Sequence, residues 1–252
     1  MQTNPVPVGP VQTDPARPRI WSAAILGLGL VVGAAVFGLF FYQSRLPVKT
    51  ISVVGTATTR VQSDIVKWRI TLARTVGPQN LKSGYAAIKG DMQALQDLMT
   101  QAGLDLKDFT TQPATANQIY NPKGAEPLGY RVTQSGFLIS RNIPAVQKLA
   151  LNPETLANAG LEVQSSSLEY YISDLGQIKR KLLAEATVDA RQRAEQIAKS
   201  SGDTVAFIQS ARQGVFQITE PYSTDISDYG IYNTGTLEKD ISVTVNAQFG
   251  LR

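Results

Sequence analysis

The side chains best suited to acid–base chemistry in this sequence recur four positions apart along one predicted helix. They are Lys181, Glu185, Asp189, Arg193, Glu195 and Lys199. Paired carboxylates can transfer protons when they share a pocket. Here each carboxylate has a cation one helical turn away, which is typical of solvent-exposed ion pairs. We therefore interpret this ladder as a helix surface rather than a catalytic site.

The absence of two residue types excludes several classes of catalytic and metal-binding site. The chain has no cysteine and no histidine, which excludes a thiolate nucleophile, a Ser-His-Asp triad and the usual nitrogen and sulfur zinc sites. Ser63 and Lys67 are four residues apart, which is not the S-x-x-K spacing of a serine–lysine pair. Asp64 is better explained as a turn-capping side chain. The sequence therefore predicts no enzyme, no metal site and no cofactor.

Charge gives little support for a nucleic-acid partner. The net charge is +4 and the pI is near 9.2, and basic residues are scattered among acidic ones. The triplet Lys179, Arg180 and Lys181 could contact lipid headgroups or nucleic acid, but three charges at the start of a helix are usually just solvent-exposed. We expect no nucleic-acid binding.

A glycine-rich apolar stretch near the N-terminus indicates a membrane segment. The letters GLGLVVGAAVFG resemble a dinucleotide-binding fingerprint, but Val32 stands where the third glycine is needed. Residues 20–42 carry no charge, and a helix of that length spans about 34 Å, enough to cross the hydrocarbon core of a bilayer. Aromatic rings settle at membrane interfaces. The residues expected there are Trp21, Phe40, Phe41 and Tyr42.

The flanking segments predict the topology. Residues 1–19 contain five prolines, which favour an extended, disordered tail. Arg17 and Arg19 precede the apolar stretch and favour a cytoplasmic location for the tail. Residues 43–49 form a short linker without the small-residue site of a cleavable signal peptide. We expect a single-pass protein of the inner, cytoplasmic membrane, with residues 50–252 in the periplasm or outside the cell.

Small residues in the apolar segment suggest helix–helix packing. Gly29 and Gly33 form a G-x-x-x-G pair, and Ala34 and Gly38 form another pair of small residues. Such spacing lets two membrane helices approach closely. Glycines are common in membrane helices, so the pair gives candidate packing residues and no more.

Residues 50–252 are expected to form an α+β domain with a mixed, largely antiparallel sheet packed against helices. Residues 50–61 and 65–76 have strand periodicity and are expected to pair with each other across the turn-like QSD. Gly55 would mark a bulge or a close approach of another segment. Further strands are expected at residues 130–140, 161–173 and 238–250.

Three helical regions carry the apolar faces that would cover the sheet. The first has an apolar, methionine-containing stripe with spacings of three and four, and it ends at Gly103. The second is interrupted at Pro153, because proline cannot donate to the preceding turn. The third follows Ser173 or Asp174 as a cap and presents a narrow ridge of alanines that allows close packing. These alanines are Ala186, Ala190, Ala194 and Ala198.

The stretch from residue 213 to 240 is a candidate contact surface for another protein. Tyrosines among small polar residues make adhesive surface, and loops of this length are usually functional or disordered. The aromatic residues concerned are Phe216, Tyr222, Tyr229 and Tyr232. Partner contact and a mobile loop are equal alternatives for this stretch.

A string of segments resembles the SIMPL domain family of bacterial envelope proteins. The segments are ISVVGTATTRVQSD with the strand after it, AGLDLKDFTTQP followed by IY, LGYRVTQSGFLIS, and the four-alanine helix before SSG. The resemblance covers most of Thr50 to Phe249. It implies a mixed α+β domain, export to the periplasm or cell surface, ring-like homo-oligomers in some members, and no catalytic residues. The uncleaved anchor and Pro153 are departures from the family pattern.

These inferences predict a non-enzymatic, membrane-anchored envelope protein whose domain self-associates into a homo-oligomer, ring-like as in some relatives. Its partners would be the lipid bilayer, further copies of itself and an unidentified envelope protein. The alternative is an envelope binding module for a small molecule, a lipid or an unfolded protein, which a deep apolar cavity would reveal.

Overall fold

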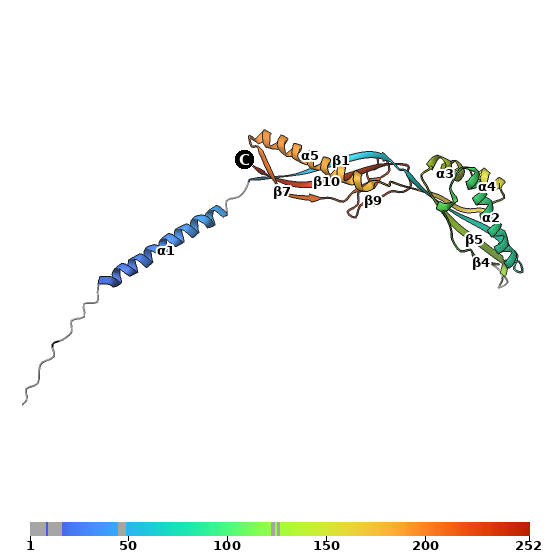
Figure 1. Ribbon diagram of the computed structural model, residues 1–252, viewed down its shortest axis with the longest axis horizontal. Helices are drawn as coiled ribbons and strands as arrows, with labels where there is room; N and C mark the ends of the chain where they lie inside the picture. Colours follow the sequence, from blue (N-terminus) through green and yellow to red (C-terminus); the bar gives the residue numbers. More distant parts are fainter. Residues whose placement is uncertain (1–8, 10–16, 45–48, 122–123, 125–126) are drawn as a thin grey trace, which may run out of the picture. The chain divides into compact units, whose positions relative to one another are not determined.

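A computed structural model of the chain describes residues 9, 17–44, 49–121, 124 and 127–252. The chain divides into two units, of which the first ends at Lys49 and the second runs from Thr50 to Arg252 (Figure 1). Helices and mixed, largely antiparallel sheets make up the second unit, so the predicted α+β class is confirmed.

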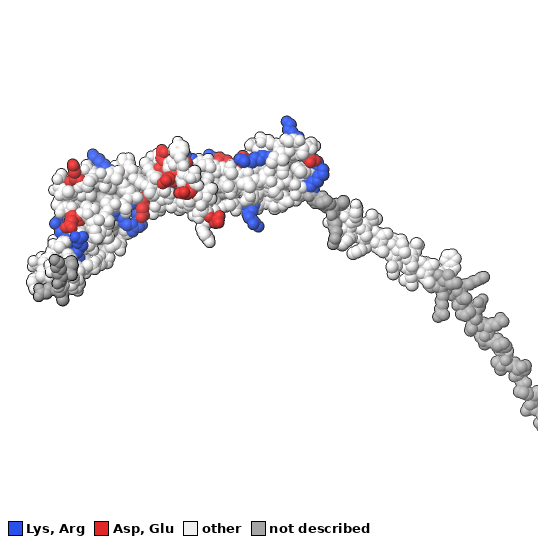
Figure 2. Space-filling view, turned by 180° about the vertical axis from the view of Figure 1, so that it is seen from behind, with Lys and Arg blue, Asp and Glu red and all other residues white. Residues whose placement is uncertain are grey.

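The first unit contains the helix α1, Arg17–Ser44. Its stretch Ala23–Ser44 is long enough and apolar enough to cross a membrane. The helix extends beyond the predicted span of residues 20–42 at both ends, and its surface is uncharged where Figure 2 draws it. The rest of the predicted tail, apart from Gly9, and linker residues 45–48 lie outside the described residues.

The second unit contains two five-stranded sheets, which we call sheet A and sheet B. In sheet A, β10 lies between β1 on one side and β7 and β8 on the other, and β9 pairs with the outer side of β8. The β8–β9 pair is parallel and the others are antiparallel. The strands are β1 Thr50–Gln62, β7 Val205–Gln213, β8 Gln217–Thr219, β9 Ile231–Tyr232 and β10 Glu238–Leu251.

In sheet B, β2 is the central strand between β5 and β6, and β3 and β4 pair with the other side of β5. The strands are β2 Ile65–Val76, β3 Phe109–Thr111, β4 Thr115–Tyr120, β5 Pro127–Ser140 and β6 Val163–Tyr171. The expected pairing of β1 with β2 is wrong. Only Ser63 and Asp64 separate these strands, and the chain uses them to pass from sheet A into sheet B instead of turning back.

One face of each sheet is covered by helices (Figure 1). Helices α2 to α4 supply the apolar core over sheet B, and α5 supplies the core over sheet A. The helices are α2 Leu81–Gln101, α3 Ile143–Ala150, α4 Pro153–Asn158 and α5 Leu175–Ser201, with a short 3-10 helix, η1, at Leu106–Asp108. The predicted interruption at Pro153 is confirmed, because α3 ends before it and α4 starts on it.

The core of sheet A depends on small residues that bring α5 close to β1. The four alanines of the predicted ridge are buried. Gly55 has no side chain because α5 occupies that space: a Cβ atom there would lie 2.1 Å from the Ala186 carbonyl oxygen and 2.4 Å from the Ala190 nitrogen. The close approach predicted at Gly55 is therefore confirmed, and the register of β1 with β10 shows no bulge at this residue.

Asp64 joins the two chain segments that pass between the sheets, residues 63–64 and residues 172–174, by hydrogen bonds. Its carboxylate accepts hydrogen bonds from the Ser173 backbone N–H at 2.8 Å and from the Ser173 hydroxyl, and the Arg141 guanidinium lies 3.3 Å away. Partial burial would raise the pKa of Asp64, but these hydrogen bonds and the Arg141 charge lower it overall. The expectation that Asp64 caps its own turn is thus replaced by a longer-range role. Asp174 holds the cap position of α5, but its side chain makes no cap hydrogen bond, so the predicted side-chain cap is not formed.

Candidate interaction surface

Strand β7 forms an unpaired edge of sheet A. It pairs with β10 on one side, and no strand within the described residues pairs with its other side. An unpaired edge presents a row of free N–H and C=O groups to another strand. Proteins commonly block such edges with prolines, charges or bulges. β7 has no proline and Arg212 as its one charge, and its register with β10 shifts at Gln248/Phe249 and at Phe249/Leu251. Residues 207–213 are all exposed.

The opposite edge of sheet A is partly covered by a carboxylate from α5. The Thr56 backbone N–H on β1 donates to Asp189 Oδ2 at 2.7 Å, and this hydrogen bond is the main cause of a lowered pKa for Asp189. Arg193 Nε donates to the same oxygen at 2.8 Å. The charge ladder predicted on this helix therefore has a structural role, because one of its carboxylates accepts a hydrogen bond from a free backbone N–H at the strand edge.

The other ladder residues form ion pairs along α5. Lys181 lies 3.9 Å from Glu185, as the four-residue spacing predicts. Glu195 pairs with Arg191 at 2.9 Å rather than with Lys199, the partner expected from the sequence. Both positions are four residues from Glu195, so spacing alone could not choose between them.

Exposed apolar side chains flank the β7 edge. Phe207 is 69% exposed, Ile208 is 43% exposed, and Val188 on the neighbouring turn of α5 is 57% exposed. A shallow hollow of about 360 Å³ lies between α5 and β7, with Val188, Ile208 and Phe249 in its lining. Apolar surface beside an open strand edge is typical of a site for protein contact.

The structure separates the four aromatic residues predicted as contact residues into two pairs. Tyr222 and Tyr229 are 83% and 98% exposed. Phe216 instead packs against the sheet A core, with Lys179 Nζ 5.2 Å from its ring centre. The ring of Tyr232 lies 6.3 Å from that of Tyr171 on β6. Tyr222 and Tyr229 are therefore the two that present most of their surface to a partner.

Tyr222 is held in place by a short network from sheet A. Its φ of 64° is rare for a residue with a side chain. Its backbone N–H donates to Asp240 Oδ2 at 3.2 Å, and the Arg60 guanidinium lies 4.3 Å from its ring centre. Arg60 also forms two hydrogen bonds with Asp240, at 2.8 and 2.9 Å, which lower the pKa of that carboxyl group.

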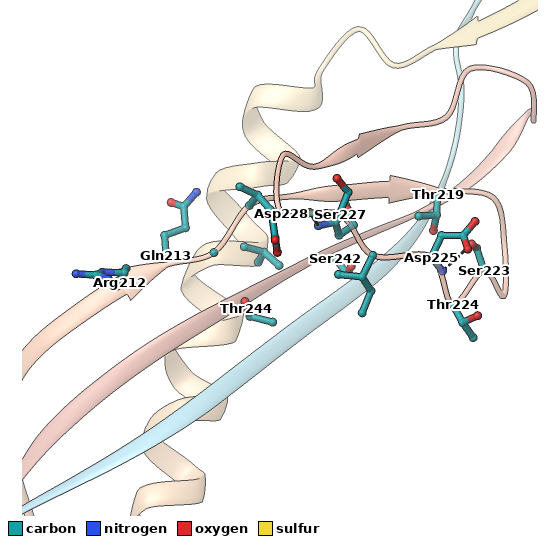
Figure 3. Close-up of a pocket in the computed structure, with 15 residues that line it drawn as sticks. Arg212, Gln213, Thr219, Ser223, Thr224, Asp225, Ser227, Asp228, Ser242 and Thr244 are labelled. Atoms are coloured by element: carbon teal, nitrogen blue, oxygen red, sulfur yellow. Dashed lines mark hydrogen bonds between the residues drawn. The ribbon is translucent and has the colours of Figure 1, made fainter.

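A half-open groove of about 820 Å³ lies beside this loop, between residues 223–228 and strands β8 and β10 (Figure 3). Its polar lining includes Ser223, Asp225, Ser227, Asp228, Ser242 and Thr244. The groove differs from the deep apolar cavity expected of a lipid-binding module. Sequence reasoning did not find it, because residues 223–228 fold back beside β8, which ends at Thr219, and approach β10 only through the pairing of β8 with β10.

Comparison with known families identifies the second unit. The family model described as SIMPL, a protein of unknown function (DUF541), matches residues 51–249. The chain belongs to the SIMPL family. The resemblance seen in the sequence is thereby confirmed, and the match includes both sheets and helices α2 to α5. A comparison with curated proteins found no match.

Ser63 and Lys67, which the sequence excludes as a serine–lysine pair, have separate surroundings in the SIMPL domain. Lys67 Nζ lies 4.9 Å from the ring centre of Phe137, on sheet B. Ser63 is buried, and its hydroxyl has no hydrogen-bond partner among the described atoms. Within the described residues, no cluster of three or more Asp and Glu side chains could hold a metal ion.

Outside the SIMPL domain, the candidate residues of α1 lie on the exposed surface of the helix. A Cβ atom added at Gly29 or Gly33 would meet nothing within 4 Å. The predicted interface residues are all exposed, and they are Trp21, Phe40, Phe41 and Tyr42. These positions are accessible to lipid or to a second helix, and their roles stay predictions.

Proposed function

We propose that this chain is a membrane-anchored envelope protein whose SIMPL domain self-associates through the edges of sheet A. The family membership and the apolar N-terminal helix are both consistent with an envelope protein. The observation that carries the self-association is the open edge of β7, nine residues long, with exposed apolar side chains beside it. In this proposal α1 crosses the inner membrane with its N-terminus in the cytoplasm, and the domain lies outside.

The contact is head-to-tail, with β7 of one copy beside the part of β1 in the next copy that precedes Thr56, because the Thr56 N–H is already bonded to Asp189. Both strands are antiparallel to β10, so they run parallel to each other and would pair as parallel strands when the sheet continues. This arrangement covers apolar groups on both flanks, because Val54 and Ile197 on the β1 side are 47% and 53% exposed. A symmetric contact between two copies of β7 would leave that flank uncovered.

Helix dimensions are compatible with this continuation of the sheet. Three strands per copy occupy about 14 Å at a strand spacing of about 4.8 Å. A helix with its side chains is about 10 Å wide. The α5 helices of neighbouring copies therefore fit side by side over the continued sheet, and a head-to-tail contact closes into a ring when its rotation permits.

No catalytic step is part of this proposal. The carboxylates of α5 are engaged by ion pairs and by the β1 edge, which supports a structural use of these charges. The domain would act as a scaffold at the membrane surface, and another envelope protein could attach through the exposed Tyr222 and Tyr229.

Single cysteines test the contact cleanly, because the chain has no cysteine of its own. Ser210→Cys places a thiol on β7, Val54→Cys places one on β1, and Lys89→Cys on the exposed surface of α2 is the control. A short bis-maleimide should join Ser210→Cys to Val54→Cys in a mixture of the two proteins, and should leave the control monomeric. Cross-linking of Ser210→Cys only to itself would show a symmetric dimer instead, and no cross-linking of either β7 or β1 would contradict the proposal.

A further inference from the structure

We infer that the loop of residues 220–229 in one copy docks on the open face of sheet B in another copy. We call this loop the acidic loop, and the open face is the face of sheet B opposite helices α2 to α4. The inference rests on the proposed self-association and adds a second contact to it. It names a further copy of the chain as the partner of the exposed Tyr222 and Tyr229.

The acidic loop combines negative charge with large exposed apolar side chains. Residues 213–237 contain Glu220, Asp225 and Asp228 but no lysine or arginine, although the net charge of the whole chain is +4. Figure 3 shows both aspartates on the segment that runs beside β8 and β10. A partner of this loop must be cationic and partly apolar, because an acidic surface would be repelled. The exposed apolar side chains are Tyr222, Ile226 and Tyr229.

The acidic loop is fixed before a partner binds. Asp240 and Arg60 hold Tyr222, and both lie on the face of sheet A opposite α5, because they alternate with core residues along β10 and β1. Farther along the loop, Gln217 Nε2 donates to the Ser227 carbonyl at 2.7 Å. A fixed loop loses little conformational entropy on binding, which favours docking of its exposed side chains together.

The open face of sheet B carries an excess of positive charge. Its residues on β2 alternate with core residues and include Lys67 and Arg69. Arg131 on β5 shares the face, because it lies opposite Thr75. Glu169 on β6 lies opposite Lys67 and is the one carboxylate in the described strands of sheet B. Three cations and one carboxylate therefore give this face a net positive charge.

The cations of the open face remain accessible to a second carboxylate. Arg69 Nε lies 3.6 Å from Glu169 Oε1, and the Arg69 side chain is 52% exposed. Exposed ion pairs are weak, so Arg69 can exchange this partner at little cost. Lys67 Nζ lies 4.9 Å from the ring centre of Phe137, and the neighbouring Ile139 is exposed. The face therefore offers apolar surface together with its charge.

The two surfaces are complementary in charge and in apolar character. In the docked pair, Asp225 and Asp228 lie against Arg69 and Arg131, and the exposed rings of the loop pack on the apolar residues of the face and on its arginines. Charge complementarity sets the orientation of a contact more than it adds affinity. We therefore assign this contact to copies that the anchor and the sheet A contact already hold at high local concentration. Free domains would not assemble through it alone.

The test uses the full chain in lipid vesicles, in mixtures of two single-cysteine proteins. Thr224→Cys places a thiol on the acidic loop. Ser167→Cys places one on the open face, opposite Arg69. A short bis-maleimide joins the two proteins where the loop of one meets the face of the other.

Charge reversals test what pairs the two surfaces. Asp225→Lys/Asp228→Lys reverses the loop aspartates in the first protein, and Arg69→Glu/Arg131→Glu reverses the arginines of the face in the second. Circular dichroism checks that each variant is folded. The matched controls reverse as many charges on α2 and α4, and they are Asp97→Lys/Glu154→Lys and Lys82→Glu/Lys89→Glu.

We expect the loop and face cysteines to cross-link in the native pair and in both controls. Each reversal alone should lower the yield of this cross-link at least about fivefold, because like charges then meet. The two reversals together should restore it, because opposite charges meet again.

Cross-linking of Ser210→Cys to Val54→Cys in the same vesicles reports the sheet A contact separately. If that pair cross-links and the loop–face pair does not, the present inference is wrong and the proposed self-association stands. If neither pair cross-links, both are wrong. A loop–face cross-link that neither reversal weakens, or that the combined reversals do not restore, would also overturn the inference, because charge would then not pair the surfaces.

Discussion

Gly55 shows how a single missing side chain sets the distance between two elements. Helix α5 occupies the space where a Cβ atom would lie, and its contacts there are backbone atoms that cannot rotate away. The buried alanines on α5 serve the same close contact from the other side. The sequence suggested both features separately, as a glycine in a strand and as an alanine ridge on a helix. Only the structure shows that they meet.

Gly55→Ala should therefore destabilise the domain. Overpacking of a tight contact costs about 1–3 kcal/mol, and here α5 must move away from β1 to admit a methyl group. Chemical denaturation followed by fluorescence of the buried Trp68 measures the change. The control is Gly90→Ala in α2, where a Cβ atom meets nothing within 4 Å and alanine should stabilise the helix by about 0.5–1 kcal/mol. Equal stability of the Gly55 variant and the native chain would contradict the packing described here.

Lys239 is a second residue whose environment affects stability, because its burial makes the free energy of unfolding depend on pH. It is fully buried near the start of β10, where its Nζ donates to the Thr236 carbonyl at 2.6 Å. Burial lowers its pKa from 10.5 to about 8. Below about pH 8 the folded and unfolded chains are both protonated here, and the folded chain bears the full cost of a buried charge. From there to pH 10.5 only the unfolded chain still binds the proton, so the free energy of unfolding rises with pH.

We predict that this lysine contributes a rise of order 3 kcal/mol in the free energy of unfolding across that pH window. Lys239→Met keeps the length of the side chain and removes the charge, so the variant should lack this rise. Denaturation of both proteins at about pH 7 and about pH 10 gives the difference. The comparison cancels tyrosine ionisation, which affects both proteins alike. Identical pH dependence in the two proteins would show that Lys239 does not titrate in this range.

At the scale of elements, periodicity predicted most of the SIMPL domain but not which strands pair. The alternation in β10 correctly gave its buried residues, because that pattern reflects a face covered by a neighbour. The stripe in α2 was correct from Ile88 to Met99, but its first members, Leu81 and Tyr85, are half-buried and exposed. The partners of β1 and β2 depend on the direction that the chain takes after Ser63 and Asp64. Local periodicity carries no information about that direction. The strand β7 was missed, because its exposed residues show no alternation. For the same reason, the open edge formed by β7 could not be found from sequence.

The helix α1 carries a prediction of its own. Gly29→Leu with Gly33→Leu adds side chains where a Cβ atom meets nothing within 4 Å, and both positions lie outside the SIMPL domain, so the stability of that domain should not change. If the pair packs two membrane helices, cross-linking between copies through α1 should weaken in the variant. Leu28→Ala/Leu30→Ala, which leaves the glycines in place, is the control. Unchanged cross-linking in the glycine variant would assign the helix an anchoring role without specific packing.

For the whole molecule, we propose that α1 anchors the chain and that the SIMPL domain assembles it. The two units are distinct, and the contact proposed between copies lies entirely within the SIMPL domain. Residues 45–49 connect the units, and five extended residues reach at most about 18 Å, so in the proposed topology the domain would lie near the membrane. Anchoring then raises the local concentration of the domains and strengthens even a weak contact. Assembly should still occur without the anchor.

The most direct test of this account is the native mass of a chain that lacks residues 1–42, measured across micromolar concentrations. We predict a folded, soluble domain with masses of several copies, and a monomer for the matched variant Phe207→Lys/Ile208→Lys, in which lysines block the β7 edge. Circular dichroism checks that both proteins are folded. A folded but monomeric native domain, with assembly only in the full chain, would contradict the account and would assign the association to the membrane helices.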